Sequence, residues 1–223
     1  MSKSFLDRID EATGDALLSR CRVRTLPARS ILFFEGDDAH EVMIVRHGQV
    51  KVFLTTADGR EVVLDVLGTG HLLGEMSAID GGRRSANATS LDKVTIAALG
   101  LDSFRQFLAE HPSAAVAMLG AITERLRAAS RRQVEFATVD ALGRVCRRLA
   151  DMVERFADGD PAAITITAPL SQTEIGAWAG LSREAVVKAL HALRSLGWIA
   201  TDGRSIKVLD LDAVRSRADL ALD

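Results

Sequence analysis

Apolar and polar positions follow two different periods along the chain. Between residues 22 and about 100, short apolar runs such as SILFFEGD and KVTIAALG are bounded by Gly and Asp. The dipeptide Asp58-Gly59 between two β-rich runs is typical of a hairpin turn. Short strands at this regular spacing predict a β-sandwich or barrel and argue against a βαβ fold.

From Leu101 onward the apolar period is that of a helix. Asp102 can cap a first helix that Pro112 ends, and a second helix is expected from about 113 to 139. Spacings of three and four define a narrow stripe along the second helix: Leu119, Ile122, Leu126, Ala129, Gln133 and Phe136. Such a stripe is typical of pairing with a partner helix, so we expect a homodimer; a helix lying on its own domain is the alternative.

A third region begins at Asp140, which can cap the helix ALGRVCRRLADMVERFA. The segment DGDP ends that helix, AITIT is expected to be a strand, and two short helices follow. The run GWIATDGRSIKVLD predicts a hairpin on Asp202-Gly203. The sequence therefore predicts three parts: residues 1–112, 113–139 and 140–223.

Composition and charge narrow the class of protein. The 223 residues are 48% hydrophobic and 26% charged, with a formal net charge of −2, so any basic surface is local. Cys21 and Cys146 form no close pair, which argues against a disulfide framework, a zinc site or an iron–sulfur cluster. No run approaches the ~18 apolar residues of a membrane span, so a cytoplasmic protein with no membrane partner is expected. No nucleophile–base pair or metal-ligand spacing stands out, so we expect no catalytic residues, no enzyme activity, no metal and no haem.

The stretch SQTEIGAWAGLSREAVVKALHALRSLGWI has the spacing of a helix-turn-helix. Ser171 and Glu174 have capping-box spacing, and Gly180 lies in the short turn between the helices. Ser182 can cap the second helix, whose first turn is expected to be exposed. An ordinary αα-hairpin with a charged solvent face is the alternative.

Cations gather on the second helix of this pair and on the hairpin that follows. Residues 182–207 contain five Lys or Arg and two acidic residues. Arg can pair with guanine and Glu can accept from cytosine, whereas cations on a wing suit phosphates. The residues expected at double-stranded DNA are Ser171, Gln172, Ser182, Arg183, Glu184, Lys188, Arg204 and Lys207.

The segment GEMSAIDGGRRSA, residues 74–86, combines a carboxylate, a guanidinium and three glycines. Gly74 permits close approach of a ligand, Arg84 supplies a fixed cation, and Ser85 and Ala86 are small enough to leave their amides open to a phosphate. Glu75 would repel a phosphate but suits a neighbouring hydroxyl donor such as a ribose 2′-OH. These residues describe a nucleotide pocket; a solvated loop with incidental charges is the alternative.

The chain resembles the CRP/FNR family of bacterial transcription regulators. GEMSAIDGGRRSA resembles the phosphate-binding cassette of cyclic-nucleotide-binding domains, and LSREAVVKALHALRSLGWI follows the β-rich half and the long helix in the family's order. The resemblance covers about residues 5 to 215. It implies an α+β fold with an N-terminal β jelly-roll cyclic-nucleotide-binding domain, a long dimerisation helix and a C-terminal winged helix-turn-helix. It also implies a homodimer on a palindromic operator and contact with RNA polymerase, for which the loop FADGDPAA is a candidate by its position.

The family's functional residues carry over onto named positions of this chain. The ligand-binding residues implied are Gly74, Glu75, Arg84, Ser85, Ala86, Arg125, Ala129 and Ser130. The cassette would hold the ribose and the cyclic phosphate, and Arg125 would reach back to Glu75. Cyclic-AMP-responsive members bind adenine through adjacent Thr and Ser on the long helix, whereas this chain has Ala129-Ser130. Cyclic AMP is the expected effector; cyclic GMP, another nucleotide or no nucleotide at all are the alternatives.

Overall fold

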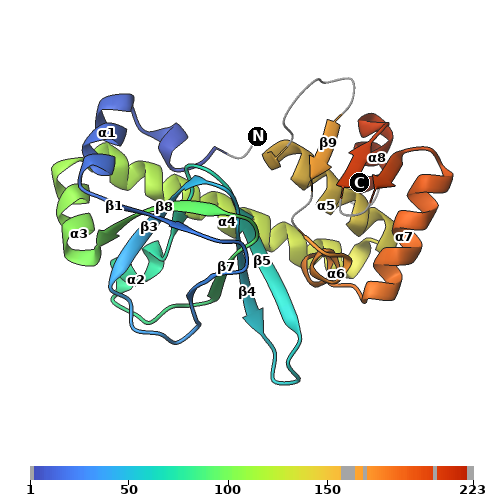
Figure 1. Ribbon diagram of the computed structural model, residues 1–223, viewed down its shortest axis with the longest axis horizontal. Coiled ribbons are helices and arrows are strands. Elements are labelled where there is room, and N and C mark those ends of the chain that lie inside the picture. The colour runs from blue at the N-terminus through green and yellow to red at the C-terminus, as the bar shows by residue number, and fades with distance from the viewer. Residues whose placement is uncertain (1–2, 157–163, 168–169, 203–204, 220–223) are drawn as a thin grey trace. The chain divides into compact units, whose positions relative to one another are not determined.

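The computed structural model describes residues 3–156, 164–167, 170–202 and 205–219 (Figure 1). The chain forms two compact units. One comprises the described residues up to Leu54 together with Leu64–Arg127, and the other comprises Thr55–Val63 together with the described residues from Ala128 onward. A β-rich first half, a long helix and a C-terminal helix-turn-helix follow one another along the chain, so the predicted α+β architecture is confirmed.

Two four-stranded sheets occupy the β-rich half. The first has the strand order β1-β8-β3-β6, with β1 at Arg22–Leu26, β8 at Val94–Gly100, β3 at Glu41–His47 and β6 at Leu72–Leu73. The second has the order β2-β7-β4-β5, with β2 at Ile31–Phe33, β7 at Asn87–Ser90, β4 at Val50–Thr55 and β5 at Glu61–Leu67. In the first sheet, Ala97 of β8 pairs with Val23 of β1 on one side and with Ile44 of β3 on the other.

Alternation along β3 and β8 fills two hydrophobic clusters, because successive side chains of a strand point to opposite faces. Met43, Val45 and Ile96 pack with buried residues of the second sheet such as Val50 and Ala88. Side chains of the opposite face pack with the flanking helices in a second cluster, which includes Val42, Ile44, Ala97, Leu17, Phe104 and Phe107. The central strands are thus buried on both faces, which explains their nearly continuous apolar runs.

Helices flank the first sheet. The elements are the 3₁₀ turn η1 at Leu6–Arg8, α1 at Glu11–Ser19, α2 at Glu75–Asp80, α3 at Leu101–Glu110 and α4 at Pro112–Thr138. The expected helix after residue 100 is confirmed, but its capping was wrong, because Gly100 is the N-cap and Asp102 instead pairs with Arg105 at 3.2 Å. Pro112 begins α4, since proline is well tolerated in the first turn of a helix.

The second unit carries the helix-turn-helix. Its elements are α5 at Ala141–Phe156, β9 at Ile164–Thr167, α6 at Gln172–Ala179, α7 at Arg183–Ser195, β10 at Ile199–Asp202, β11 at Ser205–Val208 and α8 at Leu211–Asp219. The strands form one sheet in the order β10-β11-β9. The hairpin predicted on Asp202-Gly203 is present as β10 and β11, although Gly203 itself lies outside the described residues. Helix α8, which the sequence pattern did not predict, packs on α5, and Arg147 donates to the carbonyl of Ala218 at 2.9 Å.

Candidate functional site

A left-handed glycine sets the geometry at the start of the cassette, residues 74–86. Gly74 follows β6 and precedes α2 with φ of +74°. A Cβ at this position would lie 1.9 Å from Nη1 of Arg84, so the guanidinium occupies space that only glycine leaves open. Sequence reasoning treated the segment as a loop, whereas residues 75–80 form the short helix α2, which ends at the left-handed Gly81.

Arg84 is buried without a carboxylate partner. Only 5% of the residue is exposed, and its Nη1 and Nη2 donate to the backbone carbonyls of Gly74 at 3.2 Å and Glu41 at 2.7 Å. Its guanidinium carbon lies 4.4 Å from the ring centre of Phe33. Nε has no hydrogen-bond partner, and within the described residues no carboxylate lies within ion-pair distance. Burial lowers the pKa of Arg84. The nearby carboxylates of Glu41, Glu75 and Asp37 partly offset this effect, because their negative charges raise the pKa. A buried cation of this kind is stabilised by a bound anion.

The neighbouring arginine has a different environment. Arg83 is exposed, pairs with Asp38 at 3.1 Å and donates to the carbonyl of Gly36 at 2.7 Å. Of the two consecutive arginines, therefore, Arg84 is the buried cation and Arg83 has a surface ion pair. The sequence assigned the ligand to Arg84, and the structure shows how the two side chains differ.

Glu75 and Arg125 form a pair within the first unit. Glu75 is the first residue of α2 and is 4% exposed. Nη1 of Arg125 donates to Oε1 of Glu75 at 2.7 Å, and Nη2 donates to the carbonyl of Leu72 at 2.6 Å. Arg125 therefore binds both the end of β6 and the start of α2 from helix α4.

The other cassette residues lie after α2. Ser85 is exposed and its hydroxyl lies 3.5 Å from the sulfur of Met76, whereas Ala86 is buried just before β7. Ala129 and Ser130 lie on α4 after the division between the two units, with Ala129 partly buried and Ser130 exposed. The structure therefore brings Gly74, Arg84, Glu75 and Arg125 together within the first unit, whereas Ala129 and Ser130 belong to the second unit.

The apolar stripe of α4 differs from the predicted one. Ile122 packs against the core of the first unit, and Phe136 lies so close to Gly180 that a Cβ there would be 3.1 Å from its ring. Ile122 is thus partly buried within the chain, whereas Phe136 contacts the helix-turn-helix and is still 43% exposed. The large apolar side chains of α4 that are at least half exposed are Val116, Leu119, Leu126 and Val134. Leu119 and Leu126 belong to the predicted stripe, and Ile122 between them is partly buried against the first unit.

Local capping interactions hold the helix-turn-helix. The hydroxyl of Ser171 accepts from the amide of Glu174 at 3.2 Å, and the Glu174 carboxylate accepts from the amide of Ser171 at 2.8 Å. Gly180 ends α6 with φ of +63°, and Ser182 caps α7 by accepting from the amide of Ala185 at 3.2 Å. The hydroxyls of Ser171 and Ser182 therefore have structural partners of their own.

One side of α7 is buried and the other is exposed. Val186, Ala189, Leu190 and Leu193 are buried, and the exposed side carries Arg183, Glu184, Val187, Lys188 and His191. Sequence reasoning missed Val187 and His191, although their spacing of four and eight residues from Arg183 places them on the same face. The amide of Glu184 and the Ser182 hydroxyl lower the pKa of the Glu184 carboxyl, with smaller contributions from the two neighbouring cations.

Two further residues predicted at DNA lie on α6 and on β11. Gln172 is exposed at the start of α6, and Lys207 is exposed on β11. Arg204 lies outside the described residues. Residues 157–163 of the loop FADGDPAA also lie outside them. Arg194 is one of the five cations of residues 182–207, and it donates to the hydroxyl of Thr201 at 3.0 Å, which connects α7 to β10.

A buried ion pair lies beneath the helix-turn-helix and was missed from the sequence. Nη2 of Arg148 on α5 donates to Glu135 on α4 at 2.7 Å, and both side chains are nearly inaccessible. Asp151 approaches the same nitrogen at 3.4 Å, and the Arg148 guanidinium carbon lies 5.3 Å from the ring centre of Trp178 on α6. Burial raises the pKa of Glu135, and the positive charge of Arg148 partly offsets this effect by lowering it. The hydrophobic pattern does not reveal this pair. Glu135 and Arg148 are charged residues at buried helix positions, where the pattern leads one to expect apolar side chains.

The described residues provide neither a metal site nor a membrane-spanning helix. No group of three or more His, Cys, Asp or Glu side chains there could hold a metal ion. No helix in those same ranges has the length and apolar character needed to cross a membrane.

Known proteins resemble both halves of the chain. The family model for the cyclic nucleotide-binding domain matches residues 23–111, and that for the Crp-like helix-turn-helix domain matches residues 143–217. The CRP-like cAMP-activated global transcriptional regulator of Mycobacterium tuberculosis is 30% identical over 203 residues, which cover 91% of each chain. The cAMP-activated global transcriptional regulator CRP of Haemophilus influenzae is 29% identical over 199 residues, 87% of each chain. The solved structure of the c-di-GMP responsive global regulator CLP of Xanthomonas campestris superimposes with a TM-score of 0.77 at 24% identity, covering 89% of this chain and 99% of that one.

Proposed function

The chain belongs to the CRP/FNR family of bacterial transcription regulators, and we propose that it binds a palindromic DNA operator as a homodimer controlled by a cyclic nucleotide. Its relatives are regulators and not enzymes. We assign residues 1–112 to the sensor, 113–139 to the dimerisation helix and 140–223 to the DNA-binding domain. The observation that carries the proposal is the buried guanidinium of Arg84, which has no carboxylate partner among the described residues.

The cassette suits a sugar linked to a phosphate. Arg84, with Ser85 and Ala86 beside it, would hold the cyclic phosphate, since a guanidinium pairs well with phosphate oxygens. The Glu75 carboxylate would accept a hydrogen bond from the ribose hydroxyl, while its Oε1 accepts from Nη1 of Arg125 at 2.7 Å. Gly74 leaves room for the Arg84 guanidinium beside the backbone, and two relatives are described as cAMP-activated. Cyclic AMP is therefore the proposed effector.

The base of the nucleotide is a separate question, because Ala129 lacks the hydroxyl that its counterpart in cyclic-AMP-responsive members supplies. One lost hydrogen bond costs about 0.5–1.5 kcal/mol net, or up to about tenfold in affinity. Ser130 keeps its hydroxyl on the exposed side of α4. A regulator that prefers cyclic GMP, or that binds DNA with no nucleotide, is the alternative.

The exposed side chains of α4 support the homodimer. Val116, Leu119, Leu126 and Val134 are large, apolar and at least half exposed on one long helix. Removing apolar surface from water stabilises by about 25 cal/mol per Å². A second α4 would cover these side chains, and the twofold pair would present two α7 helices to DNA about 34 Å apart, one turn of the double helix.

Readout of DNA is assigned to the exposed face of α7. Arg183 and Glu184 would contact base edges, and Lys188 would contact a base as a point charge without the bidentate geometry of arginine. Cations such as Lys207 on the wing would contact phosphates, which position the protein without reading sequence. Contact with RNA polymerase stays a prediction from the family.

The test is a DNA-binding titration of the full chain on an operator selected from a random library. We expect cyclic AMP to raise the affinity for DNA, the Arg84→Leu variant to lose this effect, and the matched Arg83→Leu variant to keep it. Equal responses of the two variants would remove the assigned cassette role. Tight DNA binding that ignores both cyclic AMP and cyclic GMP would favour the nucleotide-independent alternative, and a monomer in light scattering would contradict the dimer.

A further inference from the structure

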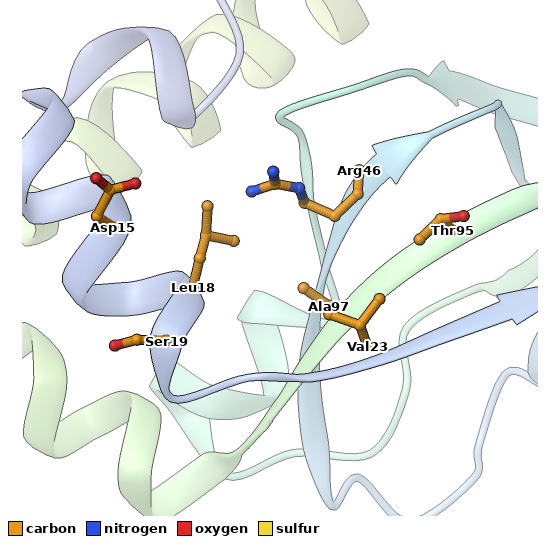
Figure 2. Close-up of a pocket in the computed structure, with 7 residues that line it drawn as sticks. All are labelled: Asp15, Leu18, Ser19, Val23, Arg46, Thr95 and Ala97. Atoms are coloured by element: carbon orange, nitrogen blue, oxygen red, sulfur yellow. The ribbon is translucent and has the colours of Figure 1, made fainter.

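A cavity of about 620 Å³ lies between α1 and the outer face of the first sheet, and no cassette residue lines it. Helix α1 contributes Asp15, Leu18 and Ser19, and the strands contribute Val23 of β1, Arg46 of β3 and Ala97 of β8 (Figure 2). Its volume falls within the range of about 300–1,000 Å³ typical of small-molecule sites.

The cavity forms where the core beneath α1 ends. Leu17 is fully buried against the sheet, but Leu18 on the next position is only partly buried. The small side chain of Ala97 forms part of the floor, and its pairing partner Val23 is 65% exposed although it is a β-branched residue in a strand. This apolar floor is therefore left open to solvent at the β1 edge of the sheet.

Two opposite charges face the cavity without partners. The side chains of Asp15 and Arg46 are exposed, and neither makes a hydrogen bond or an ion pair with any described residue. By contrast, Arg20 at the end of α1 pairs with Glu110 at 2.7 Å, and Arg8 in η1 pairs with Glu124. Figure 2 shows the Arg46 guanidinium reaching from β3 toward α1, with Leu18 pointing into the space between it and Asp15.

We infer that this cavity binds a small zwitterion with an aliphatic side chain, of the α-amino acid class. The carboxylate would pair with Arg46, the ammonium group with Asp15, and the side chain would cover Leu18, Val23 and Ala97. Both charges are exposed in the structure, so a ligand of a single sign would cover one of them without pairing it and would lose the binding energy of the second ion pair. The inference does not depend on the cassette, because the two sites share no residue.

The occupied site would stabilise one position of α1. The ligand would bridge α1 to strand β3, and Ser19 keeps an acceptor on its hydroxyl while it donates to the carbonyl of Ala16 at 2.9 Å. Residues before α1 are already joined to α4 through the ion pair of Arg8 with Glu124. A bound amino acid would therefore raise the stability of the N-terminal segment against the β-rich unit.

Calorimetry on the full chain tests the site, with L-leucine as the probe and 4-methylpentanoate and 3-methylbutylamine as analogues that each lack one charge. We expect saturable binding of leucine and at least tenfold weaker binding of both analogues. Arg46→Gln and Asp15→Asn are expected to weaken leucine binding at least tenfold. The matched control is Arg22→Gln. Arg22 is exposed and directly precedes Val23 in β1, so its side chain points to the face of the strand opposite the cavity.

Each outcome decides the inference. Absence of leucine binding overturns it, as does equal binding of leucine by wild type and the Arg46→Gln and Asp15→Asn variants. Equal affinity for leucine and 4-methylpentanoate overturns the zwitterion and the role of Asp15. Melting temperatures without ligand show whether each variant is folded, and unchanged cyclic-nucleotide binding by Arg46→Gln separates this site from the cassette.

Discussion

Arg125 donates from Nη1 to Oε1 of Glu75 at 2.7 Å, so a helix that begins at Pro112 holds the first acidic residue of the cassette. Glu75 is nearly inaccessible, whereas the side chain of Arg125 is 29% exposed. The pair therefore orients the carboxylate that would meet the ribose, and it connects the cassette to the helix proposed to form the dimer.

Removal of this arginine is the first prediction. Arg125→Met should lower the free energy of unfolding by about 1–3 kcal/mol, because the buried carboxylate of Glu75 loses its charged partner. It should also weaken nucleotide binding. Urea denaturation and calorimetry measure the two effects, with Arg127→Met on the exposed side of α4 as the control. Equal losses in both variants would show that the contact with Glu75 is energetically unimportant.

Gly74 and Gly81 provide a matched pair of substitutions. Both have φ near +70°, but a Cβ at Gly74 would lie 1.9 Å from Nη1 of Arg84, whereas a Cβ at Gly81 would meet nothing within 4 Å. Each Gly→Ala variant should lose about 1–3 kcal/mol of stability from backbone strain. Only Gly74→Ala should also abolish cyclic-nucleotide binding, since it displaces Arg84. Titration of both variants with nucleotide measures this difference, and retained binding by Gly74→Ala would contradict the assigned geometry.

The buried pair of Glu135 and Arg148 predicts strongly unequal costs for single and double substitutions. Arg148→Met should destabilise by about 3–5 kcal/mol, because it leaves the Glu135 carboxylate buried and unpaired. The double variant Glu135→Met, Arg148→Met should recover most of this loss. A double-mutant cycle by chemical denaturation measures the coupling, and additive effects would contradict it.

Glu135 also predicts a pH dependence of stability. Burial raises its pKa above the usual 4.5, so the folded state binds the proton more tightly than the unfolded state. Its contribution to stability is therefore greatest below pH 4.5 and falls as pH rises through the raised pKa. Glu135→Gln should flatten this part of the curve of unfolding free energy against pH. An unchanged slope would show that other groups cause the dependence.

Base readout and phosphate contact predict two different signatures. Arg183→Ala should relax operator preference at one position by about 1–3 kcal/mol, whereas Lys207→Ala should weaken all sequences equally and reduce the salt slope by about 1. Competition with base-substituted operators at two salt concentrations distinguishes them. If Arg183→Ala left the preference unchanged at every position, the assigned register of α7 on DNA would be wrong.

The two thiols should differ in reactivity. Burial raises the pKa of Cys146 to about 11, and Cys146 is fully buried on α5. The pKa of the half-buried Cys21 is also raised by burial, but its side chain is partly accessible. A thiol reagent at pH 8 should therefore label Cys21 first and Cys146 only after unfolding, since the thiolate is the reactive form. Rapid labelling of a Cys21→Ser variant would contradict the burial of Cys146.

Local signals were sufficient for much of the fold. The change of period near Leu101, the capping box of Ser171 with Glu174 and the turn glycine Gly180 each depend on residues at most a few positions apart. Helix α8 was missed, and so was α2, because a six-residue helix is too short to show a periodic stripe.

The sequence by itself determined the order of the elements, the exposed cations of α7 and the residue types of the cassette, because these follow from spacing along the chain. Only the tertiary structure decided which of Arg83 and Arg84 is buried, which positions of α4 stay exposed, and that Glu135 meets Arg148. Those outcomes depend on segments far apart in the sequence, whose side chains gain or lose water only when they pack against one another.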